Sequence, residues 1–117
     1  MIKFRDLTVW QKGMELAENV YTCTQQFPRA EIYGLTAQIR RSVVSIPSNV
    51  AEGKAIGGQS YPRHVKIALG SEAELQTQLE LARRLRMLRE GEAVELLERA
   101  SHVGRMLVSL LNSLPRT

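Results

Sequence analysis

The fold class is decided by residues 93–114, AVELLERASHVGRMLVSLLNSL. Small or apolar residues recur in this stretch at alternating spacings of four and three. They are Ala93, Leu97, Ala100, Gly104, Leu107, Leu111 and Leu114. This spacing places them on one face of an α-helix, so we predict an amphipathic helix that ends at Pro115.

A second apolar row, made of Leu96, Val103 and Leu110, runs beside the first at a spacing of seven. Two interpretations are open. Both rows can form one broad buried stripe, as globular helices often have, or one row can pack against another copy of the protein. We favour self-association, because a chain of 117 residues has a limited interior.

The first of three further helices is expected to begin near Leu7 or Thr8. Either Thr8 together with Gln11, or Asp6, can cap its start, and Pro28 stops it. Its predicted apolar stripe comprises Trp10, Met14, Ala17, Tyr21 and Thr24, widened by Leu7, Val20 and Phe27.

The second helix is expected to begin between Glu31 and Leu35 and to end at Gly53. Pro47 lies inside the helical pattern. Because proline lacks a backbone N–H and strains the preceding turn, we expect a kink or a break near it. The predicted buried face consists of Leu35, Ile39, Val43, Ile46 and Val50.

Residues 54–59 contain Gly57 and Gly58 and form the only loop of flexible composition. Ser60 is expected to cap a third helix that runs to about Leu88, and a short connection at residues 89–91 makes the third and fourth helices antiparallel. The stripe of the third helix is Val65, Ala68, Leu69, Leu75, Leu79, Ala82 and Leu85. The whole pattern predicts one domain over residues 1–117, an all-α, antiparallel up-down four-helix bundle with its second helix kinked near Pro47.

The composition is that of a globular protein, with 44% hydrophobic and 24% charged residues. The N-terminal residues contain no apolar run of the kind found in signal peptides. No stretch of the sequence approaches the ~20 consecutive apolar residues that are needed to span a bilayer. We therefore expect a cytoplasmic protein that does not contact a membrane.

The residues that usually carry chemistry are few. The single cysteine, Cys23, cannot form an intrachain disulfide, and we expect it to pack as a small hydrophobe. The two histidines, His64 and His102, lie in no catalytic motif. Glu95 and Glu98 precede His102 by seven and four residues, which is not the Glu-x-x-His spacing of bundle metal sites. We expect His102 to pair with one of these glutamates, and we predict no catalytic residue, no cofactor and no metal.

The net charge of +4 is unevenly distributed. Between Glu31 and Glu72 the only acid is Glu52, set against five bases, so this stretch carries the whole net charge. We expect these bases to flank the second connection, where clustered cations bind phosphates with little further geometry. The predicted residues that bind nucleic acid, RNA or DNA, are therefore Arg40, Arg41, Lys54, Arg63 and Lys66.

A second basic run, RRLRMLR at residues 83–89, has a different interpretation. Arg84 follows Glu80 by one helical turn, and Glu90 follows Arg86 by one turn, so ion pairs within the helix are favoured. We therefore predict a solvated face of salt bridges there.

Two carboxylates bear on the availability of the predicted nucleic-acid site. Glu72 lies close to the apolar stripe of the third helix, and a buried charge without a partner is costly. Arg40 or Arg41, on the neighbouring helix, is a plausible partner of Glu72, and Glu74 lies two residues further on. Whether these arginines face outward or form such pairs separates a nucleic-acid-binding surface from a protein-interaction scaffold.

Several segments together resemble a known family. They are FRDLTVWQK at residues 4–12, FP at 27–28, YGLT at 33–36, QIRR at 38–41, SIPSNVAEG at 45–53, ALGS at 68–71, ELQTQL at 74–79 and Ala82. This pattern is similar to the four-helix-bundle proteins encoded within intervening sequences of bacterial 23S ribosomal RNA genes. Related bundles are accessory proteins to the reverse transcriptases of diversity-generating retroelements.

The resemblance implies a bundle that assembles into a ring-like homopentamer and binds RNA or DNA through a basic surface. It also implies that the segment around Pro47 stays helical, which favours a kink over a break. We therefore expect a non-catalytic, homo-oligomeric bundle that binds nucleic acid. The alternative is a scaffold that docks another protein, for example a reverse transcriptase, without contacting nucleic acid.

Overall fold

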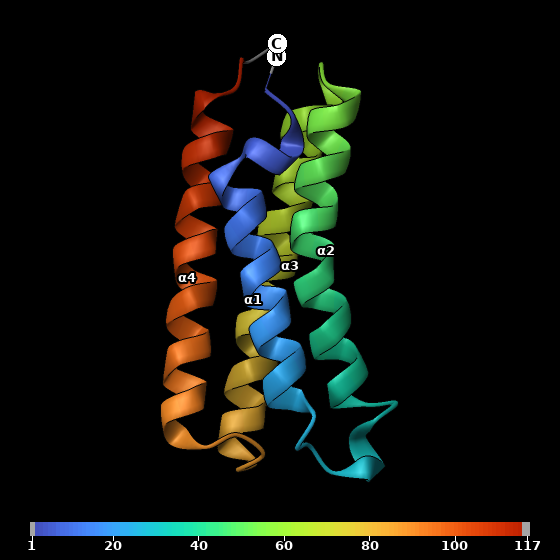
Figure 1. Cartoon of the computed structure of the whole chain (residues 1–117), viewed down its shortest axis with the longest axis vertical. Helices are drawn as coiled ribbons and strands as arrows, with labels where there is room; N and C mark the ends of the chain where they lie inside the picture. Colours follow the sequence, from blue (N-terminus) through green and yellow to red (C-terminus); the bar gives the residue numbers. More distant parts are fainter. Residues whose placement is uncertain (1, 116–117) are drawn as a thin grey trace.

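The computed structural model describes residues 2–115, and four long helices run in alternating directions along an elongated body of 45 × 24 × 22 Å (Figure 1). They are α1 (Thr8–Thr24), α2 (Leu35–Ile56), α3 (Ser60–Arg84) and α4 (Glu90–Ser113), with short 3-10 turns η1 (Phe4–Asp6) and η2 (Arg29–Glu31). Within residues 2–115 there is no strand. The predicted all-α, antiparallel four-helix bundle is confirmed.

The helices form a square in which each contacts its two neighbours along the chain and α4 closes back on α1. The most extensive contact is between α2 and α3, and the least extensive is between α1 and α4. Helices α1 and α3 stand on one diagonal of the square, and α2 and α4 on the other. The apolar stripes of all four meet along the central axis, as an up-down bundle requires.

The predicted buried face of α2 is correct at every position, whereas the stripe of α1 is rotated. Ala17, Val20, Thr24 and Phe27 are buried as predicted, but Met14 and Tyr21 are 39% and 41% exposed, and Val9 and Leu16 are buried in their place. Gly13 is buried on this face of α1, where a Cβ would make ordinary contact with the Pro47 ring at 3.5 Å.

Helix α2 runs without a break through Pro47, which is buried inside it. The bend expected at Pro47 stays a prediction. Gly53 does not end the helix, because α2 continues to Ile56. The chain turns instead at Gly57 and Gly58, whose φ angles of 76° and 56° lie in the left-handed region that favours glycine.

The predicted helix caps are wrong. Asp6 accepts a hydrogen bond from the Lys3 N–H (3.0 Å) in η1, and neither Thr8 nor Ser60 caps a helix with its side chain. The start of α2 is instead capped by Glu31, whose carboxylate accepts from the Leu35 N–H (3.1 Å).

Helix α3 ends at Arg84, earlier than the predicted Leu88. The chain turns at Arg86, which has a φ of 60°, and Leu85 is therefore exposed. Leu88 is still buried, because the turn folds it back onto the core.

The two apolar rows of α4 both belong to the core of this chain. Leu96 and Val103 are buried together with Ala100 and Leu107, and Leu110 packs against the same core. The first of the two interpretations therefore holds, and α4 carries one broad buried stripe. Self-association stays a prediction.

Candidate nucleic-acid interface

Three of the five predicted nucleic-acid-binding residues gather at one end of the bundle. Lys54 lies in the last turn of α2, and Arg63 and Lys66 lie in the first two turns of α3. Arg63 and Lys66 are exposed, and the Lys54 ammonium lies 5.7 Å from the centre of the Tyr61 ring. We call Lys54, Arg63 and Lys66 the connection patch.

A groove of about 660 Å³ extends the connection patch toward α4. Arg63 and Lys66 form one wall of it, and Leu111, Asn112 and Pro115 at the end of α4 form the other. The groove is thus bounded by two cations on one side and by apolar and amide groups on the other. No ion pair within residues 2–115 involves Lys54, Arg63 or Lys66.

The close approach of α2 and α3 holds the connection patch in place, and Gly53 makes this approach possible. A Cβ on Gly53 would lie 2.8 Å from the Cβ of His64 and 3.2 Å from the Tyr61 carbonyl oxygen. Gly53 is therefore a packing residue, where the sequence suggested a helix stop.

His64 links the two helices beneath the connection patch. Its ring is buried, and Nδ1 lies 2.9 Å from the Asn49 side-chain oxygen and 3.5 Å from a Glu52 carboxylate oxygen. Nε2 faces the Arg63 guanidinium at 3.5 Å. Asn49 in turn donates to the Ser45 carbonyl (2.8 Å). The SIPSNVAEG segment thus supplies the side chains that fix α3 beside the end of α2.

Sequence reasoning missed Arg5 as part of this end of the molecule. Turn η1 packs against α2 near the connection patch (Figure 1). The exposed Arg5 guanidinium lies 5.6 Å from the centre of the Phe4 ring and 5.8 Å from that of Trp10. An arginine flanked by two aromatic residues at a helix start was the available signal. It adds a fourth cation at this end.

Arg40 and Arg41 do not join the connection patch, which corrects the expectation that folding gathers all five bases. Arg40 lies 14 residues before Lys54, which is about 20 Å along a helix. Its guanidinium lies 4.5 Å from the centre of the Tyr21 ring, and its Nε donates to the Thr24 hydroxyl (2.9 Å). Arg40 therefore ties α2 to α1. Arg41 is exposed.

Among the described residues, neither arginine pairs with Glu72 or Glu74, so the alternative of an ion pair there is excluded. Glu72 is only 6% exposed, and its carboxylate lies against Gly104 of α4 and accepts a hydrogen bond from Gln76. Burial raises the pKa of Glu72, and the hydrogen bond from Gln76 partly offsets this rise. Glu74 is exposed.

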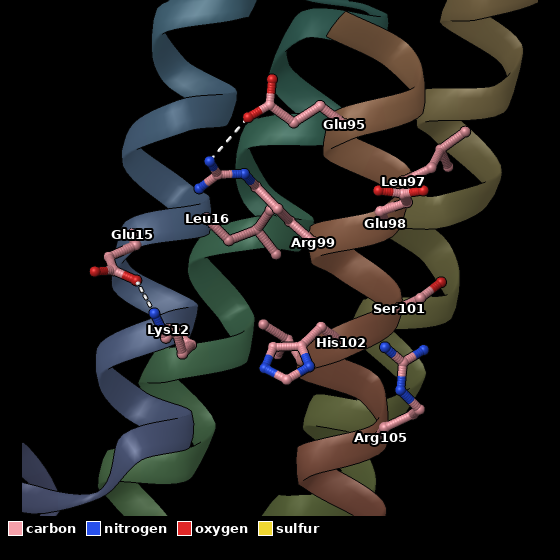
Figure 2. Close-up of a pocket in the computed structure, with 11 residues that line it drawn as sticks. Lys12, Glu15, Leu16, Glu95, Leu97, Glu98, Arg99, Ser101, His102 and Arg105 are labelled. Atoms are coloured by element: carbon pink, nitrogen blue, oxygen red, sulfur yellow. Dashed lines mark hydrogen bonds and ion pairs between the residues drawn. The ribbon is translucent and has the colours of Figure 1, made fainter. Parts of the chain in front are cut away.

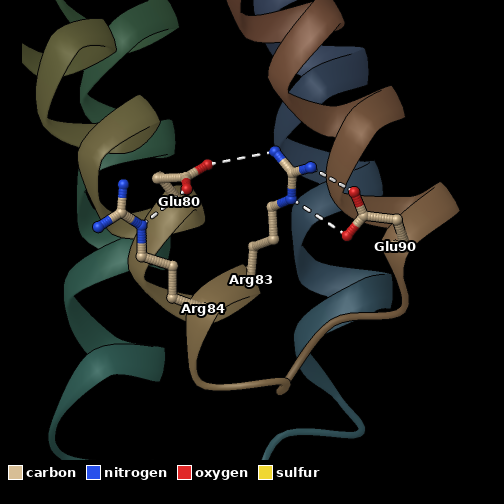
Figure 3. Close-up of polar contacts among 4 residues, drawn as sticks. All are labelled: Glu80, Arg83, Arg84 and Glu90. Atoms are coloured by element: carbon tan, nitrogen blue, oxygen red, sulfur yellow. Dashed lines mark hydrogen bonds and ion pairs between the residues drawn. The ribbon is translucent and has the colours of Figure 1, made fainter.

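The second basic run is a face of salt bridges, as predicted (Figure 3). Arg84 pairs with Glu80 at 2.9 Å, which is the predicted contact. Glu90 pairs with Arg83, where the sequence favoured Arg86, because α3 ends early and Glu90 begins α4. Arg83 thus bridges the two helices, and its hydrogen bonds to Glu90 raise its pKa.

A groove of about 900 Å³ lies between α1 and α4, where the contact between helices is least extensive (Figure 2). Lys12 pairs with Glu15 at 3.2 Å on one side, and Arg99 pairs with Glu95 at 2.8 Å on the other. The expected ion pair of His102 with Glu95 or Glu98 is therefore wrong. Within residues 2–115, no three His, Cys, Asp or Glu side chains converge as metal ligands do.

Cys23 is half-buried and packs against the core, as expected. Burial raises the pKa of its thiol, and the negative charges of Glu92 and Glu95 raise it further. Among the described helices, none is both long and apolar enough to cross a membrane.

Comparison with known proteins places this geometry in a family. The model of the family described as "23S rRNA-intervening sequence protein" matches residues 5–109, which include the connection patch and most of all four helices. The chain belongs to this family. The resemblance found in the SIPSNVAEG segment and its neighbours is thereby confirmed.

A solved structure shares the fold of this 23S rRNA-intervening sequence protein. It is a protein of unknown function from the S23 ribosomal protein family of Bacteroides thetaiotaomicron, and its TM-score is 0.81 at 21% sequence identity. The match covers 90% of this chain and 96% of the other. Among curated proteins, none matches this chain.

Proposed function

We propose that this 23S rRNA-intervening sequence protein is a non-catalytic homo-oligomer of the cytoplasm that binds RNA or DNA through the connection patch, without a cofactor or metal. One observation carries this proposal. Lys54, Arg63 and Lys66, from two different helices, meet at one end of the bundle, and no ion pair among the described residues neutralises them. Arg5 adds a further cation beside them.

Phosphate groups are the ligand that this arrangement suits. Exposed cations that line a groove attract a polyanion without requiring a particular base sequence, since phosphate contacts position a nucleic acid and do not read it. The Tyr61 and Trp10 rings lie beside Lys54 and Arg5, respectively, and hold those cations near the surface. Binding is therefore expected to be electrostatic and common to RNA and DNA.

Self-association would strengthen such binding. One chain contributes few phosphate contacts, whereas an assembly would present the connection patch once per copy to a single strand. The family resemblance implies a pentamer. Light scattering on a pentamer of the 13.2 kDa chain would give a mass of about 66 kDa, five times that of one chain.

The first prediction concerns the charge of the connection patch. Reversing two of its cations, R63E/K66E, is expected to weaken binding of a labelled 20-nucleotide RNA at least tenfold in fluorescence anisotropy at 50 mM salt. The logarithm of the binding constant should fall linearly with the logarithm of salt concentration, and the variant should show a shallower slope.

The matched control is R86E/R89E, which changes the net charge equally at the opposite end of the bundle. Both arginines are exposed, and neither forms an ion pair among the described residues. Equal affinities for the two double variants would show that only net charge matters. Salt-independent binding would overturn the proposal.

One observation favours the alternative scaffold function. Arg40 is held inside the chain by Tyr21 and Thr24, so one predicted phosphate-binding residue has a structural role. If the scaffold function is correct, R63E/K66E will leave nucleic-acid affinity at the wild-type level. Direct binding to a reverse transcriptase, measured with purified proteins, would then support the accessory role.

A further inference from the structure

The exposed residues of α2 include Gln38 and Glu52, but one outward stripe of the helix carries a single charge. This stripe consists of Ala37, Arg41, Val44, Ser48, Ala51 and Ala55, which are exposed or half-exposed and recur at alternating spacings of four and three. Arg41 is the only charged residue among them. The outward sides of α1 and α4, by contrast, carry charged pairs such as Lys12–Glu15 and Glu95–Arg99. A stripe with so little charge on the outside of a helix is typical of a surface that binds another protein.

Large apolar groups surround the start of this stripe. Tyr21, Ile32 and Val44 are exposed, and Tyr33 is 94% exposed. These four side chains and Arg41 line one depression of about 670 Å³. We call Tyr21, Ile32, Tyr33, Arg41, Val44 and Ser48 the α2 face. Contiguous exposed apolar groups with a polar rim are typical of surfaces where proteins bind.

The chain itself carries a surface that complements the α2 face. On α3, Ile67, Glu74 and Leu81 follow one another at a spacing of seven, and all three are exposed. One carboxylate thus lies between two apolar side chains, as Arg41 lies beside Val44 and Tyr33. Neither Arg41 nor Glu74 forms an ion pair among the described residues. We call Ile67, Glu74 and Leu81 the α3 row.

We propose that the α2 face binds the α3 row of a second copy of this chain, with Arg41 against the Glu74 carboxylate of that copy. This inference rests on the self-association included in the proposed function, and it names the surfaces that self-association uses. Most of the apolar stripe of α4 is buried inside the bundle. Because the two surfaces differ, the contact is heterologous. Repeating it from copy to copy closes a ring when the rotation between neighbouring copies divides a full turn evenly.

Charge reversal tests the contact between Arg41 and Glu74. Size-exclusion chromatography with light scattering, on the full chain without nucleic acid, is expected to give a multiple of 13.2 kDa for the wild type. R41E and E74R are each expected to lower the mass toward that of one chain. The double variant R41E/E74R restores the opposite charges and is expected to recover the assembly. The control R86E should keep the wild-type mass.

Tyr33 provides a test that does not depend on charge. Because its ring lies almost wholly outside the fold, Y33A should leave the circular dichroism spectrum unchanged. Y33A is nevertheless expected to raise the dissociation constant for self-association at least tenfold in sedimentation equilibrium, because aromatic side chains at an interface often contribute much of the binding energy.

Three results would overturn the inference. They are a monomeric wild type at about 100 μM, a double variant R41E/E74R that stays dissociated, and a Y33A variant that keeps its mass but loses affinity for RNA. The last result would make the α2 face a stacking surface for bases. Mass tests the contact between copies, and RNA affinity tests the proposed function. The two readouts are independent, because R63E/K66E is expected to keep the wild-type mass whether or not it binds RNA.

Discussion

At the scale of single residues, the most unusual side chain is Glu72. Its carboxylate is buried against Gly104, its hydrogen-bond donor is neutral Gln76, and no cation within residues 2–115 pairs with it. Sequence reasoning correctly recognised that Glu72 lies near the apolar stripe, but it supplied a cation that the structure does not. The spacing of apolar residues along α3 was enough to predict that Glu72 is buried. The partner of its carboxylate depends on how α3 packs against α4, and the spacing carries no information on that packing.

Glu72 makes stability depend on pH. Burial places its pKa in the folded chain above the unfolded value, so ionisation is less favourable in the folded state. The contribution of Glu72 to the free energy of unfolding is thus largest below the unfolded pKa and is lost as pH rises through the folded pKa. We predict that E72Q is more stable than the wild type at pH 8 and that the difference disappears near pH 4.

Urea denaturation at a fixed protein concentration across pH 4–8 measures this effect. E98Q serves as the control, because it removes an exposed carboxylate that forms no ion pair among the described residues. A constant difference between E72Q and wild type at every pH would contradict the prediction.

Two glycines in helices are expected to respond oppositely to alanine. At Gly53 a Cβ would meet His64 and the Tyr61 backbone at 2.8–3.3 Å, so G53A should destabilise the chain by about 1–3 kcal/mol. At Gly70 nothing lies within 4 Å, so G70A should stabilise it by about 0.5–1 kcal/mol through helix propensity. Urea midpoints for the two variants measure both signs. Similar stabilisation by both would show that α2 and α3 can separate at Gly53 at little cost.

At the scale of helices, the α2 sequence determined its structure most fully. Its five core positions fall at ideal spacing, and its helix tolerates Pro47 in the interior. The register of α1 was harder to predict, because apolar residues lie on both sides of its stripe and a glycine, Gly13, forms part of the contact. Helix ends were least predictable. They depend on Gly57, Gly58 and Arg86, whose backbone angles are set by the connections.

Pro47 offers a test of what an interior proline costs in this helix. P47A restores one backbone hydrogen bond and removes the clash of the ring with the preceding turn, and the helix propensities of proline and alanine put this gain at about 3 kcal/mol. The variant also loses the buried contacts of the ring, which costs about 1.6 kcal/mol. We predict a net stabilisation of about 1 kcal/mol in urea denaturation. P62A is the control, since a proline in the first turn of α3 breaks no helical hydrogen bond, and it should change stability by less than about 0.5 kcal/mol. A lower midpoint for P47A would show that the packing of the ring against Gly13 outweighs the restored bond.

At the scale of the whole molecule, the fold was more predictable than the candidate site. Periodicity specified four helices and their antiparallel order, because each stripe has to meet the others along one axis. Charge counting located the basic stretch, but proximity in sequence did not imply proximity in space. Residues 40 and 54 share one helix and are separated by its length, whereas residues 54 and 66 meet because the chain reverses between them. Arg5 came close through tertiary packing alone.

The square of helices is closed by its weakest side, the contact between α1 and α4. These two helices are also the farthest apart along the chain, so bringing them together has the largest entropic cost of loop closure. The packing contact that offsets this cost is the smallest of the four. The order of assembly follows from this. Helices α2 and α3 share the most extensive contact and can pair first, whereas the side between α1 and α4 closes last and opens first. Under mechanical load applied to its N-terminus, the bundle would therefore peel from the blue end of Figure 1.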